Sequence, residues 1–230
     1  MSVEAVILDI EGTVCPISFV KETLFPYFVA KIPELVHSND PDVKSVLAQF
    51  PQQYQGDLGS HMQSLVANDV KDPVLKQLQG QVWAEGYTSG QIKSPLYPDA
   101  IEFMQRSSSK LYIYSSGSVQ AQKLLFAYVE DPSNPTGPSL NLQPLIKGYF
   151  DINTSGKKVK SHSYERIVQD IKTAPQQVLF ISDNILELKA AQEAGLQTLL
   201  AIRPGNATIP DMHGFRTVES FASLQRRNCN

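Results

Sequence analysis

The chain has 230 residues, of which 42% are hydrophobic and 19% are charged, and its formal net charge at pH 7 is -3. This composition excludes a largely disordered chain, and it lacks the excess of Lys and Arg that is typical of nucleic-acid-binding proteins. We therefore expect a folded protein that binds no nucleic acid, either one large domain or a core domain that carries a smaller inserted one.

The first predicted element is a buried β-strand. The apolar run Ala5–Leu8 leads into Asp9 and is closed by Gly12. A short apolar run that ends at a turn residue is typical of a strand buried on both faces. Asp9 is therefore expected at the carboxyl end of this strand, with Glu11 two residues further along the turn.

Between Pro16 and Pro98 the pattern changes to helical spacing, without a convincing strand. Phe19–Val36 also looks helical, although Pro26 and Pro33 interrupt it. We expect residues 17–94 to form a helical cap domain, inserted into a core domain made of residues 1–16 and 95–230. Such a cap can close over a site and exclude water. The apolar stripes, whose simplest role is to form an internal core, are Val43, Val46, Leu47 and Phe50; Leu58, Met62, Leu65 and Val66; and Val74, Leu78 and Val82.

Three further apolar runs predict three more strands, and helices are expected after two of them. The helices cover Val119–Val129 and about Ile185–Ala194, and Gly195 stands where helices favour a left-handed residue. Strands that alternate with helices predict an α/β fold with a Rossmann-like, doubly wound parallel sheet covered on both faces. The strands are Leu111–Tyr114, Val178–Ile181 and Thr198–Ile202.

Polar side chains follow three of these strands, where parallel sheets bind their ligands. Asp9 and Glu11 follow the first strand, and Asp183 follows the third. A carboxylate can attack phosphorus, but two anions that approach each other need a cation between them, and Mg²⁺ prefers oxygen ligands. The pattern thus predicts a magnesium-dependent phosphoryl-transfer site. Taken alone, Asp9 and Glu11 are equally consistent with an ordinary turn.

Two more clusters suit a phosphate group. Ser115 and Ser116 lead through Gly117 into a helix, which offers hydroxyls and free backbone N–H groups, although a plain helix N-cap explains the same pattern. Lys157 and Lys158 precede another helix, where a positive charge is unfavourable unless an anion compensates it. One of the two lysines is therefore expected to face the phosphate, with a solvated charge pair as the alternative.

In chain order, the four clusters resemble the signatures of the haloacid dehalogenase superfamily: Asp-x-(Asp/Glu)-Gly-Thr, a strand-end Ser or Thr, a Lys and a strand-end Asp. Glu11 departs from the Asp that is commoner at its place in the superfamily. Further segments make the chain similar, over nearly its whole length, to the enolase-phosphatase family of methionine salvage. These segments are Phe25-Pro26-Tyr27, Trp83-Ala84-Glu85-Gly86-Tyr87, Tyr97-Pro98-Asp99, Tyr112-Ile113-Tyr114-Ser115-Ser116-Gly117-Ser118 and Arg203-Pro204-Gly205-Asn206.

The resemblance implies an α/β core typical of the superfamily, Mg²⁺ as cofactor and a phosphorylated small molecule as substrate. The implied reaction enolises 2,3-diketo-5-methylthiopentyl-1-phosphate and then removes its phosphate to give 1,2-dihydroxy-3-keto-5-methylthiopentene. By this resemblance, Asp9 is the nucleophile and a metal ligand, and Glu11 is a metal ligand that also moves protons. Asp183 is the third metal ligand. The substrate phosphate is bound by Ser115, Ser116 and Lys158. Lys158 is preferred to Lys157 because the residues after it match the family better.

Two alternatives stay open. The chain could be a general phosphatase of the same superfamily, acting on a sugar phosphate or phosphoglycolate, or a non-catalytic phospholigand-binding protein. No stretch approaches the roughly 20 apolar residues that span a bilayer, so we expect a cytoplasmic protein without a membrane partner, with the nucleus as an alternative compartment. A monomer is the default expectation. Cys15 and Cys229 lack the spacing of a disulfide framework or a zinc site.

Overall fold

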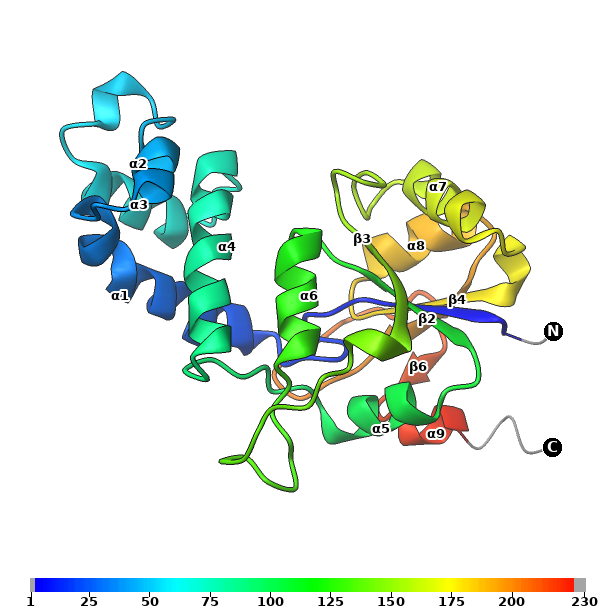
Figure 1. Cartoon of the computed structure of the whole chain (residues 1–230). Coiled ribbons are helices and arrows are strands. Elements are labelled where there is room, and N and C mark those ends of the chain that lie inside the picture. The colour runs from blue at the N-terminus through cyan, green and yellow to red at the C-terminus, as the bar shows by residue number, and fades with distance from the viewer. Residues whose placement is uncertain (1–2, 226–230) are drawn as a thin grey trace. The chain divides into compact units, whose positions relative to one another are not determined.

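The structure is a computed structural model that describes residues 3–225 (Figure 1). The chain divides into two compact units, one made of the residues up to Phe19 together with those from Lys93 onward, and the other of Val20–Ile92. These boundaries differ by a few residues from the expected ones at 16/17 and 94/95. Among the described residues, no helix is both long and apolar enough to cross a membrane.

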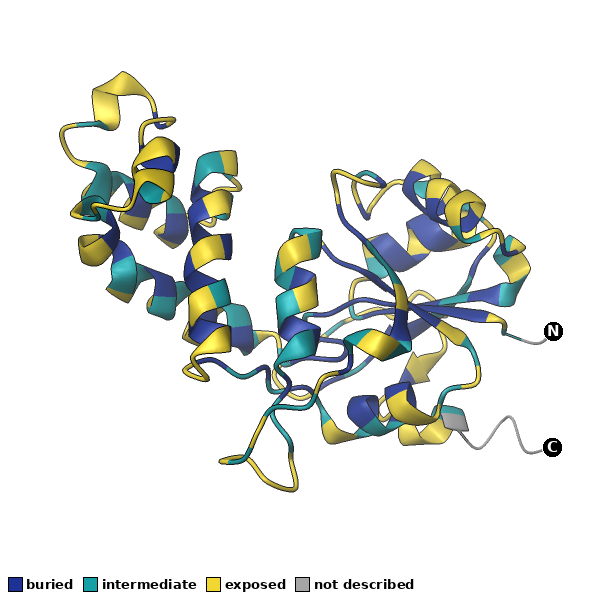
Figure 2. Ribbon diagram, viewed as in Figure 1, coloured by how far each residue is buried: buried dark blue, intermediate teal, exposed yellow. Residues whose placement is uncertain are grey.

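The first unit is built on a six-stranded sheet with the order β3-β2-β1-β4-β5-β6, in which every pair of neighbours is parallel. This confirms the predicted Rossmann-like α/β core. β1 lies inside the sheet, so its apolar side chains are buried on both faces (Figure 2). The strands are β1 (Ala5–Leu8), β2 (Lys110–Tyr114), β3 (Ile146–Phe150), β4 (Val178–Ser182), β5 (Gln197–Ala201) and β6 (Thr217–Val218).

Two of these strands were not predicted. In β3, Lys147 and Gly148 interrupt the apolar run, so the sequence pattern is weak. β6 has only two residues, Thr217 and Val218, which is too short for any periodicity to appear. Both strands flank the predicted set, β3 beside β2 and β6 beside β5.

Helices cover both faces of the sheet. Figure 1 shows α7 and α8 on one face and α5 and α9 on the other. Under α7 and α8, the side chains of Ile7, Tyr164, Phe180 and Leu188 form part of one buried core. Gly195 follows α8 with φ +84°, the left-handed conformation predicted for it. The helices of this unit are α5 (Pro98–Arg106), α6 (Val119–Ala127), α7 (Ser161–Ile171), α8 (Ile185–Glu193) and α9 (Ala222–Gln225), with short 3-10 helices at Gln143–Leu145 and Pro175–Gln177.

The second unit is helical, and no strand occurs between Val20 and Ile92. Three of its helices begin with an aspartate whose carboxylate accepts a backbone N–H: Asp40, Asp57 and Asp72. Each cap satisfies a donor that the helix itself leaves free. Pro33 lies inside α1 and does not end the helix. The elements are a π-helix (Val20–Leu24), α1 (Phe25–Val36), α2 (Pro41–Leu47), a 3-10 helix (Gln52–Tyr54), α3 (Leu58–Ala67) and α4 (Pro73–Thr88).

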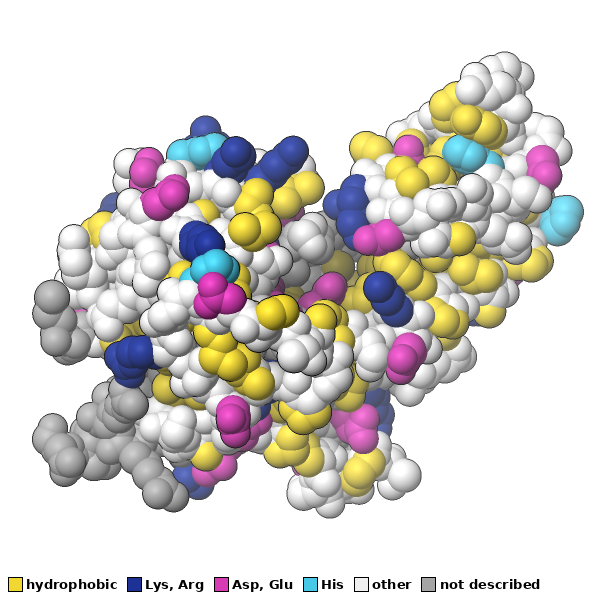
Figure 3. All heavy atoms as spheres, turned by 180° about the vertical axis from the view of Figure 1, so that it is seen from behind, with side chains coloured by type: hydrophobic (Ala, Val, Ile, Leu, Met, Phe, Trp, Pro, Cys, Tyr) yellow, Lys and Arg dark blue, Asp and Glu magenta, His cyan; other side chains and the backbone are white. Residues whose placement is uncertain are grey.

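One face of the protein carries side chains of mixed charge. On the face shown in Figure 3, Lys and Arg side chains are scattered among acidic and uncharged ones and do not gather in one patch. This face therefore offers no concentrated positive field to a nucleic-acid backbone.

Candidate functional site

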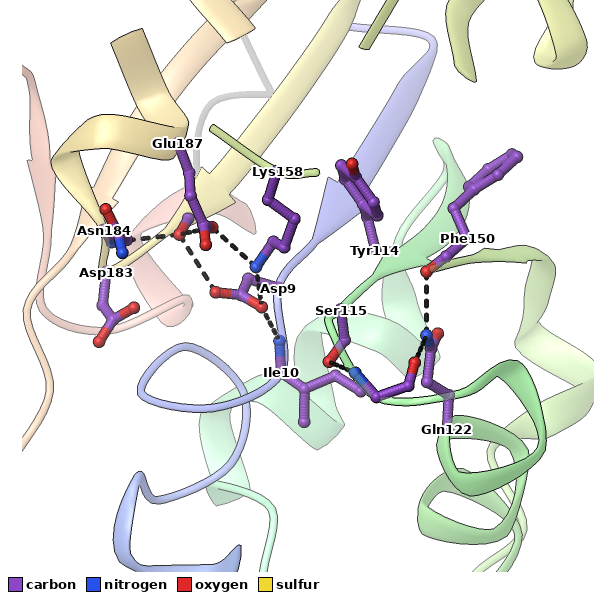
Figure 4. Close-up of polar contacts among 12 residues, drawn as sticks. Asp9, Ile10, Tyr114, Ser115, Gln122, Phe150, Lys158, Asp183, Asn184 and Glu187 are labelled. Atoms are coloured by element: carbon purple, nitrogen blue, oxygen red, sulfur yellow. Dashed lines mark hydrogen bonds and ion pairs between the residues drawn. The ribbon is translucent and has the colours of Figure 1, made fainter. Parts of the chain in front are cut away.

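The register of the sheet brings three of the predicted clusters to one edge. Leu8 pairs with Ile113 of β2 on one side and with Ile181 of β4 on the other. The residues that follow these three strands therefore emerge together at their carboxyl ends. Figure 4 shows Asp9, Ser115 and Asp183 arriving there from three separate strands.

Asp9 lies at the centre of this edge and is buried. Its Oδ1 accepts the backbone N–H of Ile10 at 2.7 Å and lies 2.5 Å from Nζ of Lys158. Its Oδ2 accepts the hydroxyl of Ser182 at 3.1 Å. Three different groups thus fix the orientation of a carboxylate that a flexible side chain would otherwise leave free to rotate.

Lys158, and not Lys157, faces Asp9. Lys157 is exposed, whereas the Lys158 side chain is only 8% exposed. Its ammonium group also lies 2.7 Å from Oε2 of Glu187, and within about 6 Å of two aromatic rings (Figure 4). Burial alone would lower the pKa of Lys158, but the charges of Asp9 and Glu187 raise it above its ordinary value, so the group stays protonated.

Glu187 is a buried member of the site that the sequence analysis missed. It lies in the first turn of α8, and its Oε2 accepts both the Lys158 ammonium and the Ser182 hydroxyl, the latter at 2.8 Å. Burial and the charge of Asp9 raise its pKa, while Lys158 opposes that shift. Its place as the acidic residue in the first turn of the helix predicted after Asp183 is the signal that could have identified it.

Asp183 follows β4 and is half-buried. Burial, followed by the negative charges of Asp9 and Glu187, raises its pKa to about 7, and Lys158 partly opposes the shift. Asp183 thus adds a third carboxylate near the one lysine that pairs with Asp9 and Glu187. A cation would relieve this crowding of negative charge. The oxygen donors also suit Mg²⁺.

The three expected metal ligands, Asp9, Glu11 and Asp183, do not form a coordination set in this structure. Among residues 3–225, no three His, Cys, Asp or Glu side chains are arranged to hold an ion as the structure stands. The Asp9 carboxylate instead contacts Lys158 and Ser182. Glu11 is half-buried on the turn after β1, where it pairs with Cys15 in an isolated β-bridge. The surplus of carboxylate charge is thus the feature that fits a divalent cation.

The two cysteines stand apart from this chemistry. Cys15 is a free, buried thiol, and burial together with the charge of Glu11 raises its pKa above the ordinary range. A thiol in such a position is a poor nucleophile. Cys229 lies outside the described residues.

The predicted phosphate loop follows β2. Ser115 is buried and its Oγ accepts the backbone N–H of Gly117 at 3.3 Å, whereas Ser116 is exposed. The N-cap of α6 is Ser118, which accepts the N–H of Ala121. The capping role therefore falls to Ser118, and Ser115 and Ser116 remain at the edge of the sheet.

Gln122 supports this loop from α6 and was also missed. Its Nε2 donates to the carbonyl of Gly117 at 2.8 Å and to that of Phe150 at 2.9 Å (Figure 4). A buried glutamine on a helix has no distinctive sequence pattern. Only the packing of α6 beside β3 reveals that one side chain joins the loop to the neighbouring strand.

Comparisons with known proteins show which proteins this chain is similar to. The family model described as haloacid dehalogenase-like hydrolase matches residues 3–195. A protein from Zygosaccharomyces rouxii named enolase-phosphatase E1 is 68% identical over 229 residues, which cover 97% of this chain and 100% of that protein. The crystal structure of the UTR4 protein from Saccharomyces cerevisiae is 56% identical, with a TM-score of 0.90, and the match covers 97% of this chain and 100% of that one.

A more distant structure shares the fold alone. CbbY from Rhodobacter sphaeroides, solved in complex with phosphate, is 16% identical with a TM-score of 0.63, and the match covers 96% of each chain. At this identity, the likeness extends to the arrangement of helices and strands and carries no argument about substrate.

Proposed function

This chain belongs to the haloacid dehalogenase-like hydrolase family, and we propose from that membership that it is an enolase-phosphatase of the methionine salvage pathway. It enolises 2,3-diketo-5-methylthiopentyl-1-phosphate and then hydrolyses the phosphate ester to give 1,2-dihydroxy-3-keto-5-methylthiopentene. The name of the relative at 68% identity supports this reaction. The observation in the structure that supports it best is the buried Asp9 carboxylate, oriented by Lys158 and Ser182 at the carboxyl edge of the sheet.

Asp9 is the proposed nucleophile. One of its carboxylate oxygens attacks phosphorus, the bond between phosphorus and the substrate oxygen breaks, and the leaving oxygen takes up a proton. Water then attacks the phosphorus of the aspartyl phosphate, which releases inorganic phosphate and regenerates the carboxylate. The contacts to Ile10, Lys158 and Ser182 hold the Asp9 carboxylate in place. The carboxylate therefore loses less conformational entropy when it aligns with phosphorus for the attack.

Asp9, Glu11 and Asp183 are the residues proposed to hold Mg²⁺. When bound, the ion supplies positive charge that lowers the repulsion between the Asp9 carboxylate and the substrate phosphate. The raised pKa of Asp183, which is due to burial and to neighbouring carboxylates, supports a cation at this position.

Ser115, Ser116 and Lys158 are the residues proposed to bind the substrate phosphate. Lys158 carries a charge that burial does not remove, because Asp9 and Glu187 stabilise it. The helical unit Val20–Ile92 is the proposed cap, whose role is to exclude water during the reaction. We further propose a cytoplasmic monomer that acts on a small phosphorylated substrate.

Glu11 is proposed to move the proton in both steps, from carbon during enolisation and to the leaving oxygen during hydrolysis. The Glu11→Gln variant should then exchange the substrate's α-hydrogen with deuterated solvent far more slowly than the wild type, because an amide cannot accept the proton. Exchange is followed by NMR, with Glu22→Gln as a control for the loss of a carboxylate. Exchange at the normal rate in Glu11→Gln would mean that another group is the base.

The reaction itself is tested by anaerobic incubation of the purified protein with the diketo phosphate substrate and Mg²⁺. Phosphate release and the ultraviolet absorbance of the conjugated enediol are followed together. Both should appear, and both should stop when EDTA is added. Phosphate release from simpler esters alone would favour a general phosphatase of the same family, and no release from any ester would favour a phospholigand-binding protein.

A further inference from the structure

The segment Arg203-Pro204-Gly205-Asn206, which follows β5, has no role in the proposed chemistry although it lies beside the site. Its first residue is firmly anchored. The Arg203 side chain is 3% exposed, and its Nη1 donates to Oδ2 of Asp99 at 2.8 Å and to the carbonyl of Glu219 at 3.0 Å. Its guanidinium carbon also lies 4.5 Å from the ring centres of both Tyr97 and Phe221. A guanidinium fixed in this way provides a rigid base for the loop.

From this base, two side chains reach the turn that follows β1. Nε of Arg203 donates to the carbonyl of Thr13 at 2.9 Å, and Nδ2 of Asn206 donates to the carbonyl of Gly12 at 2.9 Å. Two consecutive carbonyls of the turn are thus held by one loop. The same turn carries Asp9 and Glu11, two of the three residues proposed to bind Mg²⁺.

Asn206 also contacts the third of those residues. Its Nδ2 donates to Oδ2 of Asp183 at 3.2 Å, so one amide group joins the turn after β1 to the carboxylate after β4. Both partners of Nδ2 are acceptors, which fixes the orientation of the amide, because a flipped side chain would place its oxygen against them.

The turn is also shaped to receive the Asp183 carboxylate. Gly12 has φ +68°, a conformation that side chains disfavour. A Cβ atom at this position would overlap Oδ2 of Asp183, since the two atoms would lie 2.3 Å apart, and it would lie 3.0 Å from Nδ2 of Asn206. Gly12, Asp183 and Asn206 therefore form one close contact between three separate loops.

From this juxtaposition we infer that Asn206 is a positioning residue, which holds the Asp183 carboxylate against the Asp9–Thr13 turn and thereby sets the affinity of the site for a divalent cation. The inference rests on the proposed function, because Mg²⁺ is part of that proposal. In this role Asn206 is not itself a ligand of the ion. It acts through Asp183 and Gly12, as residues behind metal ligands commonly do.

Metal binding by the full-length protein tests the inference without any substrate. The dissociation constants of Mg²⁺ and Mn²⁺ are measured by calorimetry and by Mn²⁺ electron paramagnetic resonance in the wild type and in Asn206→Ala. Loss of a residue that supports a metal ligand typically weakens binding about 10- to 100-fold, and we expect an increase of this size. Asn141→Ala, which removes an exposed asparagine that caps a local turn through the N–H of Gln143, should leave the constant unchanged.

The dependence of phosphate release on Mg²⁺ concentration provides a second measure of metal affinity. In Asn206→Ala, the Mg²⁺ concentration for half-maximal release should rise in step with the dissociation constant, while the rate at saturating Mg²⁺ stays near that of the wild type. Asn206→Ser, which keeps one hydroxyl donor, should show a smaller increase, and it serves for the same comparison if Asn206→Ala does not fold.

The outcomes separate the inference from the proposal beneath it. A wild type that binds the ions and a folded Asn206 variant that binds them equally well would overturn the inference alone. An equal loss of affinity in Asn141→Ala would also overturn it. A wild type that binds neither ion would overturn the proposed cofactor, and with it this role of Asn206.

Discussion

The ammonium group of Lys158 lies between the carboxylates of Asp9 and Glu187, and the hydroxyl of Ser182 lies within hydrogen-bond distance of both carboxylates. Four side chains from three parts of the chain thus share one buried polar network. In such a network each charge is stable only while its partner is present, because removing one partner leaves a buried charge without compensation.

Replacement of Lys158 by methionine, an apolar side chain of similar length, should therefore destabilise the fold and abolish phosphate release. Removing one partner of a buried ion pair costs about 3–5 kcal/mol in unfolding free energy, which urea denaturation can measure. The exposed neighbour gives the control, since Lys157→Met should change both quantities little. Equal effects of the two substitutions would contradict the placement of Lys158 in the network.

At the level of single elements, two glycines inside helices of the unit Val20–Ile92 have opposite surroundings. A Cβ atom at Gly86 of α4 would lie 2.5 Å from Cδ1 of Ile92 and 2.9 Å from Cε1 of Tyr27. At Gly59 of α3, the nearest atom would be 3.8 Å away, in Ile32, which is an ordinary contact. Gly86 is thus required by packing, whereas Gly59 is not.

The same substitution should then have opposite effects at the two positions. Gly59→Ala should raise the unfolding free energy by at most about 0.5–1 kcal/mol, because alanine loses less backbone entropy in a helix than glycine does and Gly59 lies in the first turn of α3. Gly86→Ala should lower it by about 1–3 kcal/mol, the usual cost of overpacking a core. Urea denaturation of both variants measures the two changes, and a stabilising Gly86→Ala would contradict the close packing of α4.

Helix α5 is joined to the C-terminal part of the core through Asp99. Its Oδ2 accepts Nη1 of Arg203 at 2.8 Å and the backbone N–H of Phe221 at 2.6 Å. Burial would raise the pKa of Asp99, but these hydrogen bonds and the charge of Arg203 lower it below its ordinary value. A carboxyl whose pKa is lower in the folded state stabilises the fold above its unfolded pKa, and this contribution is lost as the pH falls through the folded value.

Asp99→Asn should therefore lower the unfolding free energy at pH 7, by about 1.5–3 kcal/mol for hydrogen bonds to a charged group. The difference from the wild type should shrink as the pH falls below about 4, near the unfolded pKa of aspartate. Urea denaturation across this range measures it. Glu102→Gln, on the same helix but in an exposed ion pair with Arg106, should cost under about 1 kcal/mol at pH 7. A pH-independent effect of Asp99→Asn would contradict the lowered pKa of Asp99 in the folded state.

At the level of the whole molecule, the sequence predicted the sheet because the interior strands have uninterrupted apolar runs, as in β1 and β4. It failed for β3, where Gly148 interrupts the run. Asp9, Ser115 and Asp183 could be placed at one edge, because parallel strands direct their carboxyl ends to the same side.

The supporting residues could not be predicted in the same way. The contacts of Gln122 and Asn206 depend on how α6 and the loop after β5 pack against other strands, which no local spacing encodes. Glu187 differs, because an acidic residue in the first turn of the helix that follows Asp183 is visible in the sequence. Long-range packing thus determines how the site is held, while the order of strands and polar clusters determines where it lies.

Formation of an aspartyl phosphate on Asp9 is tested most directly by trapping it. The protein is mixed with the diketo phosphate substrate and Mg²⁺, quenched in acid during turnover and reduced with borohydride, which converts an aspartyl phosphate into homoserine. Mass spectrometry of the digested protein should then find homoserine at position 9 and at no other aspartate. Reduction at a different residue, or none in a protein that releases phosphate, would contradict the role of Asp9 as the nucleophile.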